Sequence, residues 1–178
     1  MRMKFTRSTL FLLIWMVSCV DSIVAQTPPF TQGVNLSTWF QAESAQAIPF
    51  TKFTKKDFEN IQSLGCDVIR IPINLHAMTN GAPDYVPDPL FLFFFDEILN
   101  WAEALEIYVI LDNHSSTGVG ATDPNVGIIL NKVWAQIATH FKDRSEFLMY
   151  EVLNEPNGID NMLWGNIQGE AILSLIHI

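Results

Sequence analysis

The chain has 178 residues, of which 49% are hydrophobic, so it is long and apolar enough for about one domain with a substantial core. Its 10 basic and 19 acidic residues give a formal net charge of −9 at pH 7. This balance argues against a nucleic-acid backbone as partner, because phosphate binding needs a basic face.

The first 25 residues have the pattern of an export signal. Three basic residues open it: Arg2, Lys4 and Arg7. A nearly unbroken apolar run follows at residues 10–20, and Ala25 places a small residue before Gln26. The run is shorter than the roughly 20 residues that span a bilayer, so a cleaved signal is favoured over a membrane anchor. A third alternative is a lipoprotein signal in which Cys19 is lipidated. The cleaved signal and the lipoprotein signal both predict a secreted, periplasmic or cell-surface protein.

Residues 26–178 would form the mature domain. No later apolar run reaches the length of a membrane span. Cys66 would be the one cysteine left after removal of the signal, so no intrachain disulfide is expected. A lone cysteine in this setting is typically a small buried apolar residue.

Four strand-like segments alternate with helix-like segments after residue 29. The strands are expected at residues 33–40, 67–74, 108–112 and 147–153. The first helix is predicted by Thr54 as N-cap, Asp57 three residues later and Gly65 just past the end. The next two are predicted by a capping residue followed by proline, at Asp88-Pro89 and Asp123-Pro124. A fourth helix is expected beyond Ile159.

Apolar strands joined by helices indicate a parallel sheet covered on its faces. An open doubly wound sheet and a closed eight-stranded barrel both fit, and both place ligands at the carboxyl ends of the strands. The first strand is not followed by a Gly-x-Gly-x-x-Gly turn, which removes support for the dinucleotide-binding form of the open sheet. Four units are half of a barrel of about 250 residues. The expected fold is therefore a (β/α)₈ barrel truncated to about its first four units.

The run Asn154-Glu155-Pro156 ends the fourth strand and carries the main candidate for chemistry. Proline disfavours the helical region for the residue before it, so Glu155 is expected to be extended and to project from the strand end. A carboxylic acid at a partly apolar barrel mouth can have its pKa raised, which suits it to donate a proton near neutral pH. Taken alone, the tripeptide fits an exposed strand cap equally well.

Neighbouring strands place further polar residues at the same end. The second strand has one all-isoleucine side, which must face the helices, so Arg70 points into the barrel. Barrel layers draw side chains from alternate strands, and Glu151 on the fourth strand is then the available partner of Arg70. This pair could belong to the site or be a structural ion pair below it. The third strand ends in Asp112-Asn113-His114, where His114 could orient a sugar or the acid.

Aromatic residues near the strand ends fit a sugar-binding surface, since sugar faces stack on rings. Trp39 and Phe40 end the first strand, and Trp164 follows the fourth. Trp39 is the best candidate for a stacking platform, with core packing as the alternative. Phe93–Phe95 are expected to lie in the core in part.

Four motifs, one on each strand, carry a resemblance to a known family. They are Gly33-Val34-Asn35, Val68-Ile69-Arg70-Ile71-Pro72, Ile110-Leu111-Asp112-Asn113-His114 and Tyr150-Glu151-Val152-Leu153-Asn154-Glu155-Pro156. In this order, and over roughly Phe30 to Ile159, the chain resembles cellulase-like members of glycoside hydrolase family 5.

The resemblance implies a role for each residue. Glu155 would be the general acid/base, Asn154 would bind the sugar 2-hydroxyl, Arg70 would lie under the nucleophile and His114 would lie near the site. The family implies retaining hydrolysis of β-1,4-glucan in polysaccharide catabolism, with no metal and no cofactor. Two alternatives stay open. Other members of the family imply a different β-glycan, such as mannan or xyloglucan, and a different class of protein would be a non-catalytic glycan-binding barrel that kept the cleft.

Retention needs a second carboxylate about 5–5.5 Å from the acid, as nucleophile. The family carries it at the end of strand seven, which this sequence does not reach. Asp160 and Glu170 lie away from the strand ends and are not assigned that role. The chain is therefore expected to be the N-terminal half of the catalytic domain, inactive alone, with two open sheet edges that favour association.

Overall fold

The computed structural model describes residues 27–115, 124–156 and 158–176. Its centre is a parallel sheet whose strands lie side by side in chain order: β1 (Gly33–Asn35), β2 (Val68–Ile73), β3 (Tyr108–Asn113) and β4 (Leu148–Glu151). A doubly wound sheet reverses its strand order at a switch point, whereas a barrel adds each strand beside the one before it. The order β1-β2-β3-β4 therefore resolves the choice in favour of half a (β/α)₈ barrel.

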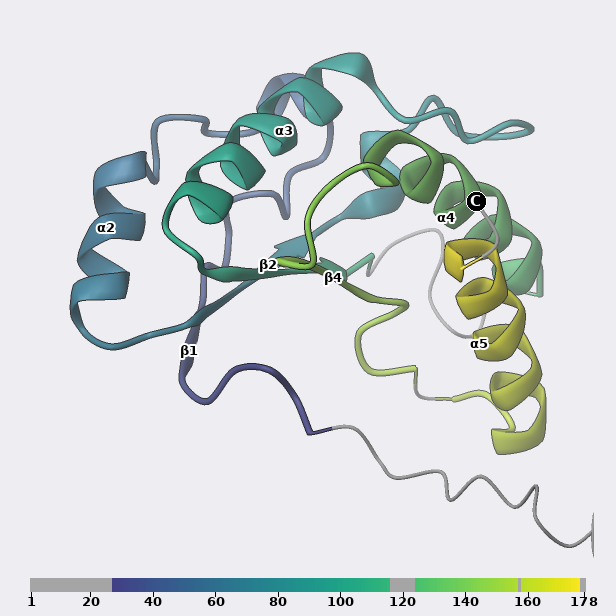
Figure 1. Ribbon diagram of the computed structural model, residues 1–178. Coiled ribbons are helices and arrows are strands. Elements are labelled where there is room, and N and C mark those ends of the chain that lie inside the picture. The colour runs from purple at the N-terminus through teal and green to yellow at the C-terminus, as the bar shows by residue number, and fades with distance from the viewer. Residues whose placement is uncertain (1–26, 116–123, 157, 177–178) are drawn as a thin grey trace, which may run out of the picture.

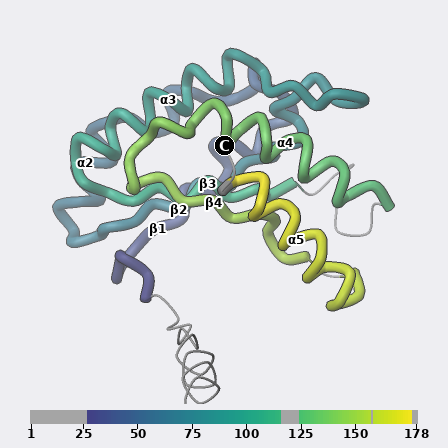
Figure 2. The backbone as a smooth tube through the Cα atoms, turned by 45° about the vertical axis from the view of Figure 1, so that its right-hand side comes forward, coloured from purple at the N-terminus to yellow at the C-terminus, as the bar shows by residue number. Residues whose placement is uncertain are grey.

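A helix follows each strand, and the helices form an arc around the outside of the sheet (Figures 1 and 2). They are α2 (Lys55–Ser63), α3 (Pro89–Ala104), α4 (Val126–Phe141) and α5 (Asn161–Ile176). Short 3₁₀ turns, η1 (Ala45–Ala47) and η2 (Leu75–Met78), follow β1 and β2. In the described part of the chain, no helix is long and apolar enough to cross a bilayer. The expected export signal, including Cys19, lies outside the described residues.

The predicted end signals of the first two helices are confirmed. The Asp57 carboxylate accepts hydrogen bonds from the backbone N–H of Thr54 at 2.7 Å and from its hydroxyl at 2.8 Å. Gly65 takes the left-handed conformation just past the helix, with φ +86°. At α3 the Asp88 carboxylate accepts from the N–H of Leu90 at 2.8 Å. These contacts satisfy donors that a helix start leaves without a partner.

The third helix begins later than predicted. Asn125 is its N-cap and Val126 its first residue, so Pro124 precedes the helix, and Asp123 lies outside the described residues. The fourth helix lies where it was expected, and the Asp160 carboxylate accepts from the N–H groups of Met162 and Leu163 at 3.0 and 3.1 Å. Aspartate is one of the preferred residues for this capping.

The core lies between the sheet and the helices. Ile69, Ile71 and Ile73 of β2 are all fully buried there, which confirms that the all-isoleucine side faces the helices. Phe95 of α3 is buried with them, whereas Phe93 is exposed, so Phe93–Phe95 belong to the core in part, as expected. Cys66 is buried and free. The opposite face of β2 carries Arg70, toward the barrel interior.

β1 and β4 end at least two residues earlier than predicted, because other contacts replace the regular pairing at their ends. β1 stops at Asn35, and the chain turns through Thr38, which has a positive φ of 59°. Phe40 then rejoins the sheet through an isolated parallel bridge to Ile73. β4 stops at Glu151, and the next carbonyl, that of Val152, accepts side-chain donors instead of a ladder bond.

Candidate active site

The guanidinium of Arg70 is the centre of a polar cluster at the inner face of the sheet. Its Nε and Nη2 atoms each donate to one oxygen of Glu151 at 2.7 Å. Nη2 also lies 2.8 Å from Asp112 Oδ2, and Nη1 donates to Asn35 Oδ1 at 3.2 Å. The hydrogen bonds to Glu151 raise the pKa of Arg70, against the opposing effect of burial. One cation therefore joins all four strands, and the predicted pairing of Arg70 with Glu151 is present.

Asn154 is brought to this cluster by the segment that follows β4. Its backbone N–H donates to the carbonyl of Asn113 at 2.9 Å, and its side-chain Oδ1 accepts from Arg70 Nη2 at 2.9 Å. Because Arg70 occupies the amide oxygen, the Nδ2 group is the part of the side chain left to donate to a ligand. This contact fixes the orientation of the Asn154 amide, with its oxygen toward Arg70.

Glu155 follows directly and is exposed. Its negative charge acts on Arg70, which places it beside the same cluster. The expectation that Pro156 holds Glu155 extended is wrong, since the residue has a φ of +45°. The strand has already ended at Glu151, so the chain turns here instead of continuing the pleat. A left-handed non-glycine residue costs roughly 1–2 kcal/mol, and such strain is concentrated at functional sites.

His114 joins the cluster through Asp112. Its Nδ1 lies 2.8 Å from Asp112 Oδ2, the same oxygen that contacts Arg70. The backbone N–H of His114 donates to the carbonyl of Ile73 at 2.7 Å, so β2 holds the residue in place. Asp112 is fully buried, and this burial raises its pKa even though His114 and Arg70 oppose the shift. The predicted residues Arg70, His114, Asn154 and Glu155 therefore lie together.

Trp39 does not belong to this group, and its prediction as a sugar-stacking platform is wrong. The side chain is 2% exposed and makes edge contacts with the rings of Phe40, Phe53 and Phe58. The turn at Thr38 breaks the strand alternation, which turns Trp39 into the core beneath α2. Trp164, the other aromatic candidate, is half-buried on α5.

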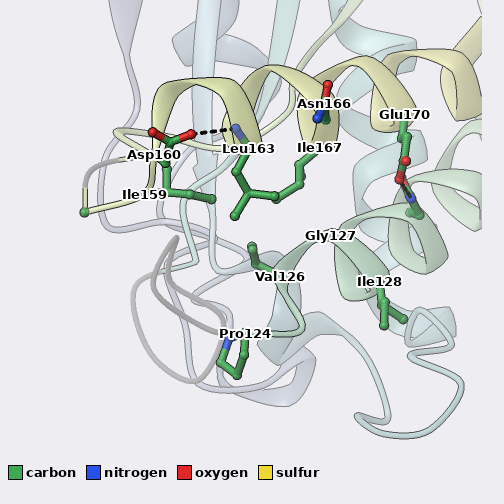
Figure 3. Close-up of a pocket in the computed structure, with 12 residues that line it drawn as sticks. Pro124, Val126, Gly127, Ile128, Ile159, Asp160, Leu163, Asn166, Ile167 and Glu170 are labelled. Atoms are coloured by element: carbon green, nitrogen blue, oxygen red, sulfur yellow. Dashed lines mark hydrogen bonds between the residues drawn. The ribbon is translucent and has the colours of Figure 1, made fainter.

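A cavity of about 600 Å³ lies between α4 and α5 on the outer side of the sheet (Figure 3). It is lined by Asp160 and Glu170, the two acidic residues that were not assigned as nucleophile. Asp160 caps α5, and Glu170 accepts a hydrogen bond from Asn131 of α4 at 3.0 Å. Both contacts lie within or between helices, and neither connects Asp160 or Glu170 to the polar cluster.

The part played by Asp112 and Asn35 was missed at the level of sequence, although both stand in the quoted motifs. Strand register contained the signal. Arg70 lies opposite Asn35 of β1, and Asp112 lies opposite Glu151 of β4. In parallel pairing, opposite residues share a side of the sheet, and Arg70 pairs with Ile110, two residues before Asp112 on the same strand. Asn35, Arg70, Asp112 and Glu151 therefore all lie on one side of the sheet, in two neighbouring rows. Across the described residues, no group of three or more His, Cys, Asp and Glu side chains could hold a metal ion.

The chain is similar to a known protein family and to individual proteins. The model of the family described as cellulase (glycosyl hydrolase family 5) matches residues 25–176. The cellulase/esterase CelE of Acetivibrio thermocellus is 31% identical over 137 residues, which are 74% of this chain and 17% of that protein. Endoglucanase B of Clostridium cellulovorans is 32% identical over 105 residues, which are 57% of this chain and 24% of that protein.

Solved structures agree with the fold. The cellulose synthase subunit Z of Clostridioides difficile has a TM-score of 0.73 at 25% identity, covering 82% of this chain and 48% of that one. Cel5A of Thermotoga maritima, solved as a mutant with cellobiose, has a TM-score of 0.74 at 25% identity, covering 84% and 51%. The chain thus spans about half the length of these structures, as expected for four of eight barrel units. Because the family model covers most of the sequence, the chain belongs to glycosyl hydrolase family 5.

Proposed function

We propose that this chain is the acid/base half of a retaining glycoside hydrolase that cleaves β-1,4-glucan. The observation that carries the proposal is the amide of Asn154, whose oxygen is held by Arg70 at 2.9 Å directly before the exposed Glu155. This geometry supports an amide donor for a sugar hydroxyl next to a carboxylic acid that can reach the glycosidic oxygen. The names of the relatives, cellulase and endoglucanase, support β-glucan as the substrate class.

In the proposed reaction, Glu155 protonates the leaving glycosidic oxygen while a second carboxylate attacks the anomeric carbon. Water then releases the sugar from that carboxylate, with Glu155 acting as base. The amide of Asn154 would donate to the 2-hydroxyl, a contact that strengthens in the transition state. Arg70 would hold Asn154 in place and offer positive charge beneath the reacting centre.

The nucleophile would come from a later strand. Among the described residues, Asp112 and Glu151 are the other strand-end carboxylates, and both are bound to Arg70. A carboxylate tied in this way is a poor nucleophile, because attack would break its ion pair. We therefore propose that the 178-residue chain alone does not hydrolyse glycans.

The decisive test uses the complete-barrel protein, meaning this chain together with residues that complete the barrel. We expect hydrolysis of carboxymethyl-cellulose and barley glucan, with the new chain end first released as the β-anomer in proton NMR. Glu155→Gln should reduce kcat on these polymers by roughly 10²–10⁴-fold, since it removes the general acid. Glu97→Gln, at an exposed position of α3, is the matched control and should retain full activity.

The same panel separates the other candidates. Faster turnover of mannan or xyloglucan than of β-1,4-glucan would identify a different β-glycan as the substrate. Glycan binding without turnover would instead indicate a non-catalytic barrel. Near-normal turnover by Glu155→Gln would assign the acid to another residue.

We also propose that the protein is exported. The basic start, the short apolar run and Ala25 before Gln26 support this proposal. Expression of the whole reading frame in a bacterial host should place the protein outside the cytoplasm with Gln26 as its N-terminal residue. An N-terminal Met1 on the mature protein would contradict cleavage.

A further inference from the structure

Asp112 occupies an unusual position in the cluster, because one of its oxygens contacts nitrogen atoms of two different side chains. Its Oδ2 atom lies 2.8 Å from Arg70 Nη2 and 2.8 Å from His114 Nδ1. The residue sits on β3, which is paired on one side with β2 and on the other with β4. Because β3 is paired on both sides, the Asp112 backbone has little freedom to move.

This placement is costly for the fold. Asp112 is fully buried, and its second oxygen, Oδ1, has no hydrogen-bond partner within the described ranges. A buried polar atom without a partner destabilises a protein, and an apolar side chain of similar size would avoid that cost. Structural support alone therefore explains Asp112 poorly, and its effect on His114 needs to be considered.

The contact with Asp112 selects one protonation form of His114. A carboxylate accepts hydrogen bonds, so Nδ1 must carry a proton, and the neutral ring then keeps its lone pair on Nε2. No hydrogen bond to Nε2 occurs within the part of the chain that the structure describes. The His114 side chain is 28% exposed while that of Asp112 is 0% exposed, so the ring edge away from Asp112 is the accessible one.

We propose that Asp112 is a positioning residue, which holds His114 with Nδ1 protonated so that Nε2 accepts a hydrogen bond from a substrate hydroxyl. The inference rests on the proposed function for the identity of the substrate. The protonation of His114 at Nδ1 does not depend on that function. The other charged groups around the pair are Arg70 from β2, Glu151 from β4 and Glu155 beyond β4. From β1 the cluster receives Asn35, which is uncharged.

The first test is ring ¹⁵N NMR of the complete-barrel protein, with the His114 signals assigned by their loss in His114→Ala. At a pH where the ring is neutral, we expect a protonated Nδ1 and an unprotonated Nε2. Asp112→Leu removes the acceptor and should shift the ring to the form with Nε2 protonated. Asp112→Asn keeps one oxygen toward the ring and should preserve the wild-type form.

Kinetics supply the second test. Asp112→Leu should lower kcat on barley glucan on the order of 100-fold, because misplacing a contact by about 1 Å can cost that much. KM should change less, and Asp112→Asn should recover much of the loss. The matched control is Asp96→Asn, since Asp96 also contacts a histidine, His140, at 2.8 Å and an arginine, but on the helix side of the sheet. That variant should leave kcat and His114 unchanged.

Several results would overturn the proposal. Wild-type His114 with the proton on Nε2 would do so without any variant, even if Asp112→Leu failed to fold. An unchanged ring in folded Asp112→Leu would do so too. If the wild-type protein binds or cleaves no glycan while His114 keeps a protonated Nδ1, the proposed function fails and the positioning of the ring stands.

Discussion

Arg70 and Glu151 form a two-pronged ion pair across an intervening strand, with Nε–Oε2 and Nη2–Oε1 distances of 2.7 Å each. Arg70 lies on β2 and Glu151 on β4, so the pair bridges over β3. It does so because alternation puts both side chains on the inner face and the intervening Asp112 adds a third contact. The pair is therefore part of the site, since the same guanidinium also holds Asn154.

Arg70→Lys should be more damaging to activity than its retained charge suggests. Lysine has one ammonium group and cannot contact Glu151, Asn154 and Asn35 in fixed directions. We expect a loss of about 1–2 kcal/mol of stability, less than for a fully buried pair because the side chains of Arg70 and Glu151 are 26% and 35% exposed. Chemical denaturation of the complete-barrel protein measures the loss of stability, and kcat/KM on barley glucan measures the loss of activity. Full activity in Arg70→Lys would show that the directed contacts are dispensable.

Trp39→Ala should act on stability and not on substrate binding. The ring is buried among Phe40, Phe53 and Phe58, and removing such a side chain typically costs 3–5 kcal/mol. Trp39→Phe should cost less because it leaves a smaller cavity. Denaturation midpoints and KM for a soluble glucan separate the two roles. A large rise in KM at unchanged stability would restore Trp39 as a sugar-binding residue.

Gly33→Ala should disrupt the pairing of β1 with β2. A Cβ atom at this position would lie 2.4 Å from Val68 Cγ1 and 2.7 Å from the Val68 carbonyl oxygen, so the backbone must shift. Such overpacking typically costs 1–3 kcal/mol. Gly165→Ala on α5 is the matched control, because nothing lies within 4 Å of its added carbon. It should stabilise the helix by about 1 kcal/mol in the same denaturation assay.

Tyr150 should make the fold sensitive to alkali. Burial raises the pKa of its hydroxyl to about 12, from an ordinary value of about 10. Between these values the unfolded chain loses the proton while the folded chain keeps it, so stability falls as pH rises, by at most about 1.4 kcal/mol per pH unit. Tyr150→Phe should remove this part of the decline. Denaturation of both proteins from pH 9 to 12 measures it, and identical pH profiles would contradict the burial of the hydroxyl.

Sequence alone determined the four repeating units and the side of β2 that is buried. These features depend on local chemistry. Asp57 and Asp88 accept hydrogen bonds from backbone N–H groups only a few residues away. A strand with three isoleucines on one side buries that side against the core. For the same reason, Glu155 and His114 could be assigned to the carboxyl ends of their strands.

Tertiary structure decided what depends on register between strands and on turns. One atom of Asp112 contacts both Arg70 and His114, which only the alignment of β2 with β3 reveals. The left-handed turn at Thr38 sends Trp39 into the core, and Glu155 is left-handed where its position before proline predicts an extended residue. Alternation in a sequence assumes an unbroken strand, so residues that follow a left-handed residue need not lie on the side that alternation predicts.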